Sequence, residues 1–193
     1  MTDRIAHIVT ESLRVKERYF AEHAESVNEA ARLLAEALGG GAKLLLCGNG
    51  GSAADAQHIA GEFVNRFLHP DRRAIPALAL STDGGVLTCI ANDTHFDRVF
   101  ARQVEAFGAR GDVLLAITTS GNSPNILLAA EQARRQGMVV IGLLGRDGGR
   151  MASLSDLALI VPSADTQRIQ ETHNLIGHII CELVESALFP AGA

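Results

Sequence analysis

The sequence lacks several features that would assign a protein to a class at once. Its three cysteines, Cys47, Cys89 and Cys181, are far apart and form no CxxC pair, which argues against a disulfide framework or a thiolate zinc site. No apolar run approaches the roughly 18 residues of a membrane span, and the charged, amphipathic N-terminus does not resemble a signal peptide. There is no basic tail, and the net charge is −5, which predicts no binding to nucleic acid or to an anionic membrane. We therefore expect a cytoplasmic protein with reduced, buried cysteines.

The size and composition are those of one globular domain. The 193 residues are 47% apolar and 20% charged, and a chain of this length buries about 70% of its unfolded surface. Because no internal repeat or linker interrupts the chain, we expect residues 1–193 to form a single domain. Apolar residues recur at helical spacing over residues 2–38 and stop at the glycines 39–41. This pattern predicts one long helix or a helical hairpin, so residues 1–40 would be an N-terminal helical extension.

The rest of the chain alternates between short apolar runs and helical patterns. The apolar runs, which we interpret as strands, cover 42–48, 74–81, 112–119, 138–145 and 156–162. The helical patterns between and after them cover 52–68, much of 84–107, 123–137, 148–155 and 166–188. This alternation predicts an α/β fold with an open, parallel, five-stranded sheet and helices on both faces. Pro76 places the second strand at an edge or marks its beginning, and ligands are expected beyond the carboxyl ends of the strands.

A glycine-rich turn follows the first expected strand. The segment Gly48-Asn49-Gly50-Gly51-Ser52 opens a helix, where free backbone N–H groups and the helix dipole favour an anion. The same residues, continued to an alanine at 53, also fit the dinucleotide-binding pattern G-x-G-x-x-A. The acidic residue that this pattern requires would lie at position 83, further along the chain than usual. A nucleotide-triphosphate loop is excluded, because no Gly-Lys-Ser/Thr follows.

A second turn, rich in hydroxyl groups, follows the third expected strand. Thr118, Thr119, Ser120 and Ser123 surround Gly121, and a proline at 124 makes the last of these serines a natural helix N-cap. These residues could be ordinary turn and capping residues. A hydroxyl-rich turn at the carboxyl end of a strand, facing the first turn and without Lys or Arg, is instead typical of a site for the phosphate monoester of a small molecule.

Two helical patterns carry polar side chains that suit proton transfer or metal binding. His58 and Glu62 are four residues apart and share one helix face. Gln170, Asn174 and His178 form a polar stripe, also spaced by four, in an otherwise apolar helix. The alternatives are a surface pair for the first group and a satisfied core histidine for the second. We interpret the histidines at 69, 95 and 173 as solvent or packing residues.

Taken together, these motifs resemble those of one family. The segments "CGNGGSAADAQHIAGEF", "ALSTD", "IANDTHFDRVFARQVEA", "GDVLLAITTSGNSPNI", "GRDGG" and "RIQETHNLIGHII" are similar to those of the phosphoheptose isomerases, which have a sugar isomerase (SIS) domain. The resemblance covers about residues 40–189 and implies a flavodoxin-like SIS fold. One departure is Thr118-Thr119-Ser120, where the family usually has Ser-Thr-Ser; the hydroxyl groups are kept.

The resemblance implies an activity and a set of site residues. The activity is conversion of sedoheptulose 7-phosphate to D-glycero-D-manno-heptose 7-phosphate through an enediol, the first step toward the ADP-heptose of the lipopolysaccharide core. Glu62 would be the general base and His178 its acid/base partner on the oxygens. The expected substrate-binding residues are Asn49, Gly50, Gly51, Ser52, Glu62, Asn92, Asp93, Thr118, Thr119, Ser120, Ser123 and Gln170. Asn92 and Asp93 could instead form a helix N-cap.

A metal site and an assembly are also implied. The expected ligands of one Zn²⁺ per subunit are His58, Glu62, Gln170 and His178. Because eight helical residues span about 12 Å, Gln170 and His178 can reach one ion only if Gln170 precedes the regular helix or if they come from different subunits. We therefore expect a homo-oligomer that uses residues 1–40 for assembly, with active sites at its interfaces; the resemblance implies a tetramer.

Three other functions compete with the isomerase. A non-catalytic SIS-domain regulator that associates with the replication initiator shares several of these motifs, but it looks like a relative without the catalytic glutamate and the last histidine, which are Glu62 and His178 here. A sugar-phosphate sensor in transcription control would need a DNA-binding domain, for which the N-terminal helical segment is too short. A nicotinamide-dependent oxidoreductase rests on the weak dinucleotide pattern alone.

Overall fold

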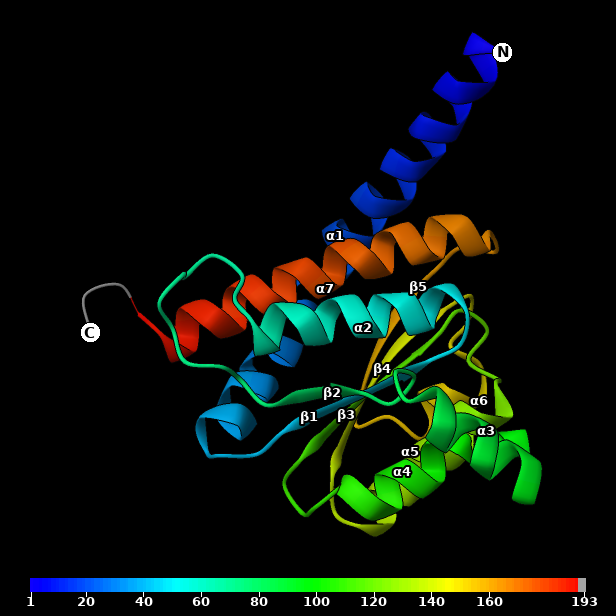
Figure 1. Cartoon of the computed structure of the whole chain (residues 1–193). Helices are drawn as coiled ribbons and strands as arrows, with labels where there is room; N and C mark the ends of the chain where they lie inside the picture. Colours follow the sequence, from blue (N-terminus) through cyan, green and yellow to red (C-terminus); the bar gives the residue numbers. More distant parts are fainter. Residues whose placement is uncertain (191–193) are drawn as a thin grey trace.

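The computed structural model describes residues 1–190 and contains the five-stranded, all-parallel sheet that the sequence predicts (Figure 1). The strands are β1 (Leu44–Gly48), β2 (Ala77–Ala79), β3 (Val113–Thr118), β4 (Val139–Gly145) and β5 (Leu157–Val161). The helices are α1 (Thr2–Gly39), α2 (Gly51–Val64), α3 (Gly84–Asp93), the 3₁₀ turn η1 (Phe96–Arg98), α4 (Val99–Phe107), α5 (Pro124–Arg135), α6 (Gly149–Ala152) and α7 (Thr166–Leu188). The strand order is β2-β1-β3-β4-β5.

Helices cover both faces of the sheet because successive strand residues point to opposite sides. Leu44 and Leu46 of β1 belong to the core shared with α1, α2 and α7. Leu45 and Cys47, which alternate with them, belong to the core shared with α4, α5 and α6. Figure 1 shows these two helical layers on either side of the strands. In one layer, α2 and α7 lie side by side.

The edge strand and two of the helices are shorter than the sequence pattern suggests. β2 lies at the edge, as Pro76 predicts, and pairs only through Ala77–Ala79. α2 ends at Val64 rather than at residue 68, because the next residues turn away and donate backbone N–H groups to the carboxylate of Glu185. The region 84–107 divides into α3, η1 and α4. Only residues 149–152 of the predicted 148–155 segment are helical.

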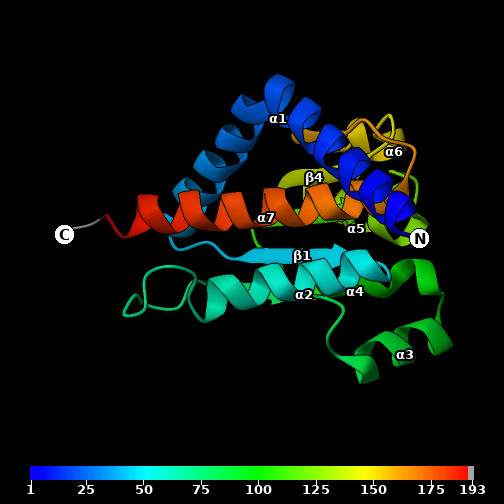
Figure 2. The same ribbon diagram turned by 90° about the horizontal axis from the view of Figure 1, so that it is seen from above.

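The N-terminal segment is one long helix rather than a hairpin. The C-terminal half of α1 buries Val27, Leu34 and Leu38 against the rest of the protein, whereas residues 1–10 are all exposed. Figure 1 shows this N-terminal half projecting away from the sheet, and Figure 2 shows α1 crossing over α7. None of the helices formed by residues 1–190 combines the length and the apolar character needed to cross a membrane.

The cysteines only partly match the expectation that all three are buried. Cys47 and Cys181 are buried, and burial raises the pKa of each thiol to about 12, which makes them inert small hydrophobic residues. Cys89 is exposed, because α3 lies outside the main helical layer and buries none of its residues. Its thiol lies 3.5 Å from a carboxylate oxygen of Asp93.

Candidate active site

The two turns predicted from the sequence meet at the carboxyl ends of β1 and β3. Helix α2 leaves β1 toward one face of the sheet and α5 leaves β3 toward the other, so the space between the two turns is a topological switch point, where α/β sheets bind ligands. A cavity of about 230 Å³ lies there. Its lining residues are Asn49, Ser52, Ile117, Thr118, Thr119, Ser123, Thr166 and Gln170. Most of these side chains carry a hydroxyl or an amide group.

Two asparagines fix the distance between the turns. The amide of Asn49 donates to Oδ1 of Asn125 at 2.9 Å, and the amide of Asn125 donates back to Oδ1 of Asn49 at 2.8 Å. Asn125 is almost completely buried, so its side chain is already held in place by packing. Forming the reciprocal pair therefore costs it little further conformational entropy. Asn49 therefore joins the two turns through its side chain, while its neighbours keep their hydroxyl groups for a ligand.

The N-termini of the two helices that start at this cavity have no side-chain cap among the described residues. Gly50, which has no side chain, is the N-cap of α2, and the N-cap of α5, Ser123, accepts no hydrogen bond from its helix through its side chain. The hydroxyl of Ser123 instead lies 3.2 Å from that of Thr118, which is 3.5 Å from that of Ser120. The Ser123 side chain thus does not play the capping role predicted for it, and both helix dipoles point at a cavity lined with hydroxyl groups.

The second turn is held from behind by a close backbone approach. Gly121 has φ +66°, and a Cβ built on it would lie 1.9 Å from the carbonyl oxygen of Gly148. Its own carbonyl accepts from the N–H of Met151, and Asn122 accepts from the N–H of Arg150. Only glycine fits at position 121, and through it the turn after β3 rests on the turn after β4.

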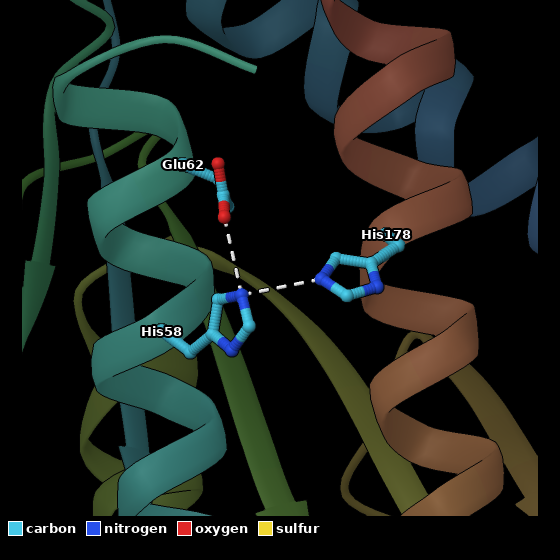
Figure 3. Close-up of side chains that lie close together, drawn as sticks. All are labelled: His58, Glu62 and His178. Atoms are coloured by element: carbon cyan, nitrogen blue, oxygen red, sulfur yellow. Dashed lines mark hydrogen bonds and ion pairs between the residues drawn. The ribbon is translucent and has the colours of Figure 1, made fainter. Parts of the chain in front are cut away.

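A second group of site residues lies further along α2 and α7. Figure 3 shows Glu62 and His58 on α2 and His178 on α7, with their polar atoms converging. Nε2 of His58 is 3.1 Å from a carboxylate oxygen of Glu62 and 3.2 Å from Nε2 of His178. One ligand atom from each residue lies within 4.8 Å of the other two, close enough to hold one metal ion. We refer to these three residues as the His-Glu-His cluster.

Gln170 does not lie in this cluster. α7 is already regular at Thr166, so Gln170 and His178 are eight helical residues apart, or about 12 Å along the axis. The Gln170 side chain packs instead against Gly51, where a Cβ would come within 2.4 Å of its amide nitrogen. Within one chain, the four expected metal ligands therefore divide: three form the cluster, and Gln170 lines the cavity between the turns.

An acidic residue that the sequence analysis missed lies between the cavity and the cluster. Asp55 is on α2, and one of its carboxylate oxygens faces the side chain of Asn174 on α7. Its other oxygen, Oδ2, is buried and has no partner among residues 1–190. Burial raises the pKa of this carboxyl group, against the opposing effects of Asn174 and His58. Because Asp55 is three residues before His58, the α2 pattern places it on the same face, which was the available signal.

The remaining candidates lie away from these groups. Asn92 and Asp93 are on the exposed last turn of α3 and hydrogen-bond to each other, so they are not at a helix N-terminus. Asp83, the acidic residue required by the dinucleotide pattern, caps α3 by accepting from the N–H of Val86. The strand order is also the flavodoxin-like one rather than that of dinucleotide-binding Rossmann folds. Neither observation favours a nicotinamide site.

His173 is a packing histidine, as expected. It is fully buried, and its Nε2 lies 2.9 Å from the carbonyl oxygen of Leu144. Burial lowers its pKa to about 4, against the opposing effect of that hydrogen bond. The ring is therefore neutral at physiological pH and donates from Nε2. It connects α7 to β4 and takes no part in the cluster, whose His178 is five residues further along α7.

Comparisons with known proteins identify the family. The SIS domain profile matches residues 9–145. The phosphoheptose isomerase of Desulfovibrio desulfuricans is 53% identical over 193 residues, covering 98% of this chain and 91% of the relative. That of Pelobacter propionicus is 59% identical over 161 residues, covering 83% and 85%.

Comparison with solved structures gives the same family as comparison with the curated relatives. The phosphoheptose isomerase from Neisseria gonorrhoeae matches with a TM-score of 0.91 at 44% identity, covering 96% of this chain and 98% of the other. The phosphoheptose isomerase from Francisella tularensis matches with a TM-score of 0.93 at 37% identity and the same coverage. The chain therefore belongs to the SIS-domain family and, within it, to the phosphoheptose isomerases.

Proposed function

We propose that this protein is an aldose–ketose isomerase that converts sedoheptulose 7-phosphate to D-glycero-D-manno-heptose 7-phosphate. The observation that carries the proposal is the two-ended site along α2 and α7. A hydroxyl-lined cavity with two uncapped helix N-termini, as far as residues 1–190 show, suits the phosphate. The His-Glu-His cluster lies about two helical turns further along α7. A sugar with its phosphate at one end and its reacting carbons at the other could span the two.

The cluster has the groups that an enediol route requires. The carboxylate of Glu62 would remove the proton from one of the two reacting carbons and return it to the other. His178 would give and take protons on the carbonyl and hydroxyl oxygens, and so limit the charge that develops there. The phosphate would act as a remote handle that fixes the carbon chain in this geometry. The cavity that would hold it is lined by Ser52, Thr118, Thr119, Ser123 and Gln170, among others.

We propose Zn²⁺ as the metal of the cluster. Two imidazole nitrogens and one carboxylate oxygen form a donor set typical of catalytic zinc, which keeps a further position open. When bound, the ion would polarise the substrate oxygens. His58 would serve as a ligand only. The two roles of Glu62 compete, because a carboxylate bound to the ion throughout turnover is a weaker base.

We also propose that α1 assembles the protein into a homotetramer with active sites at subunit interfaces. Ile5, Ile8, Val9 and Leu13 are exposed and lie on one face of the projecting half of α1, which suits packing against another copy. The separation of Gln170 from the cluster within one chain agrees with ligands shared between subunits. Light scattering is expected to give four chains of 20.4 kDa; a mass of one chain would contradict the assembly.

The cellular setting follows from this activity. Single-domain organisation over residues 1–193, cytoplasmic location and a place at the first step toward the ADP-heptose of the lipopolysaccharide core would all fit an isomerase of this kind. Detection of the protein in the soluble fraction of lysed cells, together with loss of heptose from the core on deletion of its gene, would test them. Lipopolysaccharide of unchanged composition after deletion would contradict the pathway assignment.

The decisive experiment follows the isomerisation itself. Purified protein is incubated with sedoheptulose 7-phosphate in D₂O, with and without added zinc, and with fructose 6-phosphate as the control sugar. We expect conversion of the heptulose, little conversion of the hexose, and deuterium incorporated at carbon 1 or 2, because the proton that Glu62 holds while the enediol exists exchanges with solvent before it is returned to carbon. Conversion without any deuterium would contradict the enediol route. No conversion under either condition would contradict the isomerase and favour a non-catalytic SIS-domain regulator.

A further inference from the structure

A buried ion pair connects the ends of α2 and α7 beyond the His-Glu-His cluster. Arg72 and Glu185 are each only 2% exposed in their side chains, and Nε of Arg72 donates to the carboxylate of Glu185. Burial alone would raise the pKa of Glu185, but Arg72 and three backbone N–H groups lower it to about 2. The carboxylate is therefore charged at any working pH.

Arg72 also holds the end of α2, where Glu62 is located. Its Nη2 donates to the carbonyl oxygen of Glu62 at 2.6 Å, and its Nη1 donates to that of Phe63 at 2.9 Å. These are among the last carbonyls of the helix, which lack partners inside α2. The guanidinium group thus fixes the backbone of Glu62 directly, within hydrogen-bond distance.

Glu185 holds the segment that covers His178. Its two carboxylate oxygens accept from the N–H groups of Phe67, Leu68 and His69, at 3.0, 2.6 and 3.0 Å. The Phe67 ring stacks on the imidazole of His178 with a centroid distance of 5.7 Å and an interplanar angle of 22°. The carboxylate therefore fixes the loop whose aromatic ring orients His178.

We propose that Arg72 and Glu185 are positioning residues that hold Glu62 and His178 in register across the gap between α2 and α7. Neither touches the reacting atoms. The pair acts on Glu62 through its backbone and on His178 through Phe67. This inference rests on the proposed function for its kinetic consequence, but the geometry of the cluster can be measured separately. Burying two charges is costly, and a hydrophobic pair of similar volume would often stabilise equally well; a fixed hydrogen-bonding geometry explains why ions are used here.

The test separates positioning from stability. The double variant Arg72→Met/Glu185→Leu removes both charges and leaves no unpaired ion, so it should fold. Asp112→Asn is the matched control: that carboxylate also pairs with a cation, Lys43, and accepts backbone N–H groups, but its hydrogen bonds connect the segments before β1 and β3 rather than α2 and α7. For each protein, kcat and KM for sedoheptulose 7-phosphate, the Kd for Zn²⁺ from chelator competition and the Tm are measured.

We expect the double variant to lose about 10- to 100-fold in kcat and in Zn²⁺ affinity, as is typical when the groups that orient metal ligands are removed. KM should change little, because the phosphate cavity is elsewhere, and Asp112→Asn should leave kcat and the Zn²⁺ Kd near wild type. A folded double variant with both values within threefold of wild type would overturn the proposal. If the double variant does not fold, Phe67→Leu, which keeps the ion pair, takes its place and should lower both values. If wild type itself shows no turnover, the proposed function fails, and the Zn²⁺ Kd still decides on positioning.

Discussion

Replacing Glu62 by glutamine is expected to lower kcat for sedoheptulose 7-phosphate by about 10²- to 10⁴-fold, the usual contribution of a positioned general base. The amide still accepts a hydrogen bond from His58, which lies 3.1 Å from the carboxylate, but it cannot take up a proton at neutral pH. KM should remain near that of wild type, because Glu62 does not line the phosphate cavity. The Tm should also change little, because the side chain is only partly buried.

The matched control for this variant is Glu182→Gln. Glu182 is exposed and lies four residues after His178 on α7, so the same loss of charge occurs one helical turn from the cluster. It should keep full activity. A titration with zinc then separates the two roles of Glu62: recovery of kcat at high zinc would indicate a metal ligand, whereas a persistent defect indicates the base. Unimpaired turnover by Glu62→Gln would exclude both.

The largest structural effect is expected for Gly121→Ala. A methyl group there would meet the carbonyl oxygen of Gly148 at 1.9 Å, with the backbone at φ +66°. The turn after β3 must then move away from the turn after β4. We expect a loss of about 3 kcal/mol or more in the free energy of unfolding, equivalent to a drop of about 6–12 °C in Tm. In folded protein KM should rise, because the hydroxyl groups that line the phosphate cavity are displaced. The rate should also fall, since a displacement of 1 Å can lower it about 10²-fold.

Gly111→Ala isolates the contribution of the backbone angle. Gly111 has φ +89°, and nothing lies within 4 Å of a Cβ built on it. This variant should lose only about 1–2 kcal/mol, from strain alone, with an unchanged KM. Calorimetry and initial-rate kinetics on both variants make the comparison. Equal losses in the two would show that the contact between the turns after β3 and β4 does not hold the phosphate cavity in shape.

Local patterns account for the parts of the fold that could be predicted. The five strands were visible as apolar runs because a parallel sheet is buried on both faces. The strand-end turns were visible because glycines and hydroxyl-bearing residues are clustered in the sequence there. Pro76 indicated that the second strand either begins there or lies at an edge, and both hold for β2. Each of these inferences depends on residues that are close neighbours along the chain.

What could not be predicted depends on contacts between distant residues. Asn125 reads as an ordinary residue in the first turn of α5, and only the fold brings it to Asn49, 76 residues away. Arg72 and Glu185 are 113 residues apart and belong to no motif. The place of Gln170 also required the structure, since its distance from His178 depended on where α7 becomes regular. Spacing along one helix shows which residues share a face, but not what faces them.

The crossing of α1 over α7 has a consequence for how the chain folds during synthesis. Arg168 donates to the carbonyl oxygen of Ile8, and Ser12 donates to Glu171, across separations of 160 and 159 residues. The apolar face of α1, the first helix to be synthesised, is therefore not covered until α7, the last helix, has been made. Such long-range closure slows folding and exposes hydrophobic surface to aggregation. A nascent chain stopped before α7 would lack the partner of its first helix as well as His178. The demand for chaperones should therefore end, and catalytic competence begin, when the same residues have been synthesised.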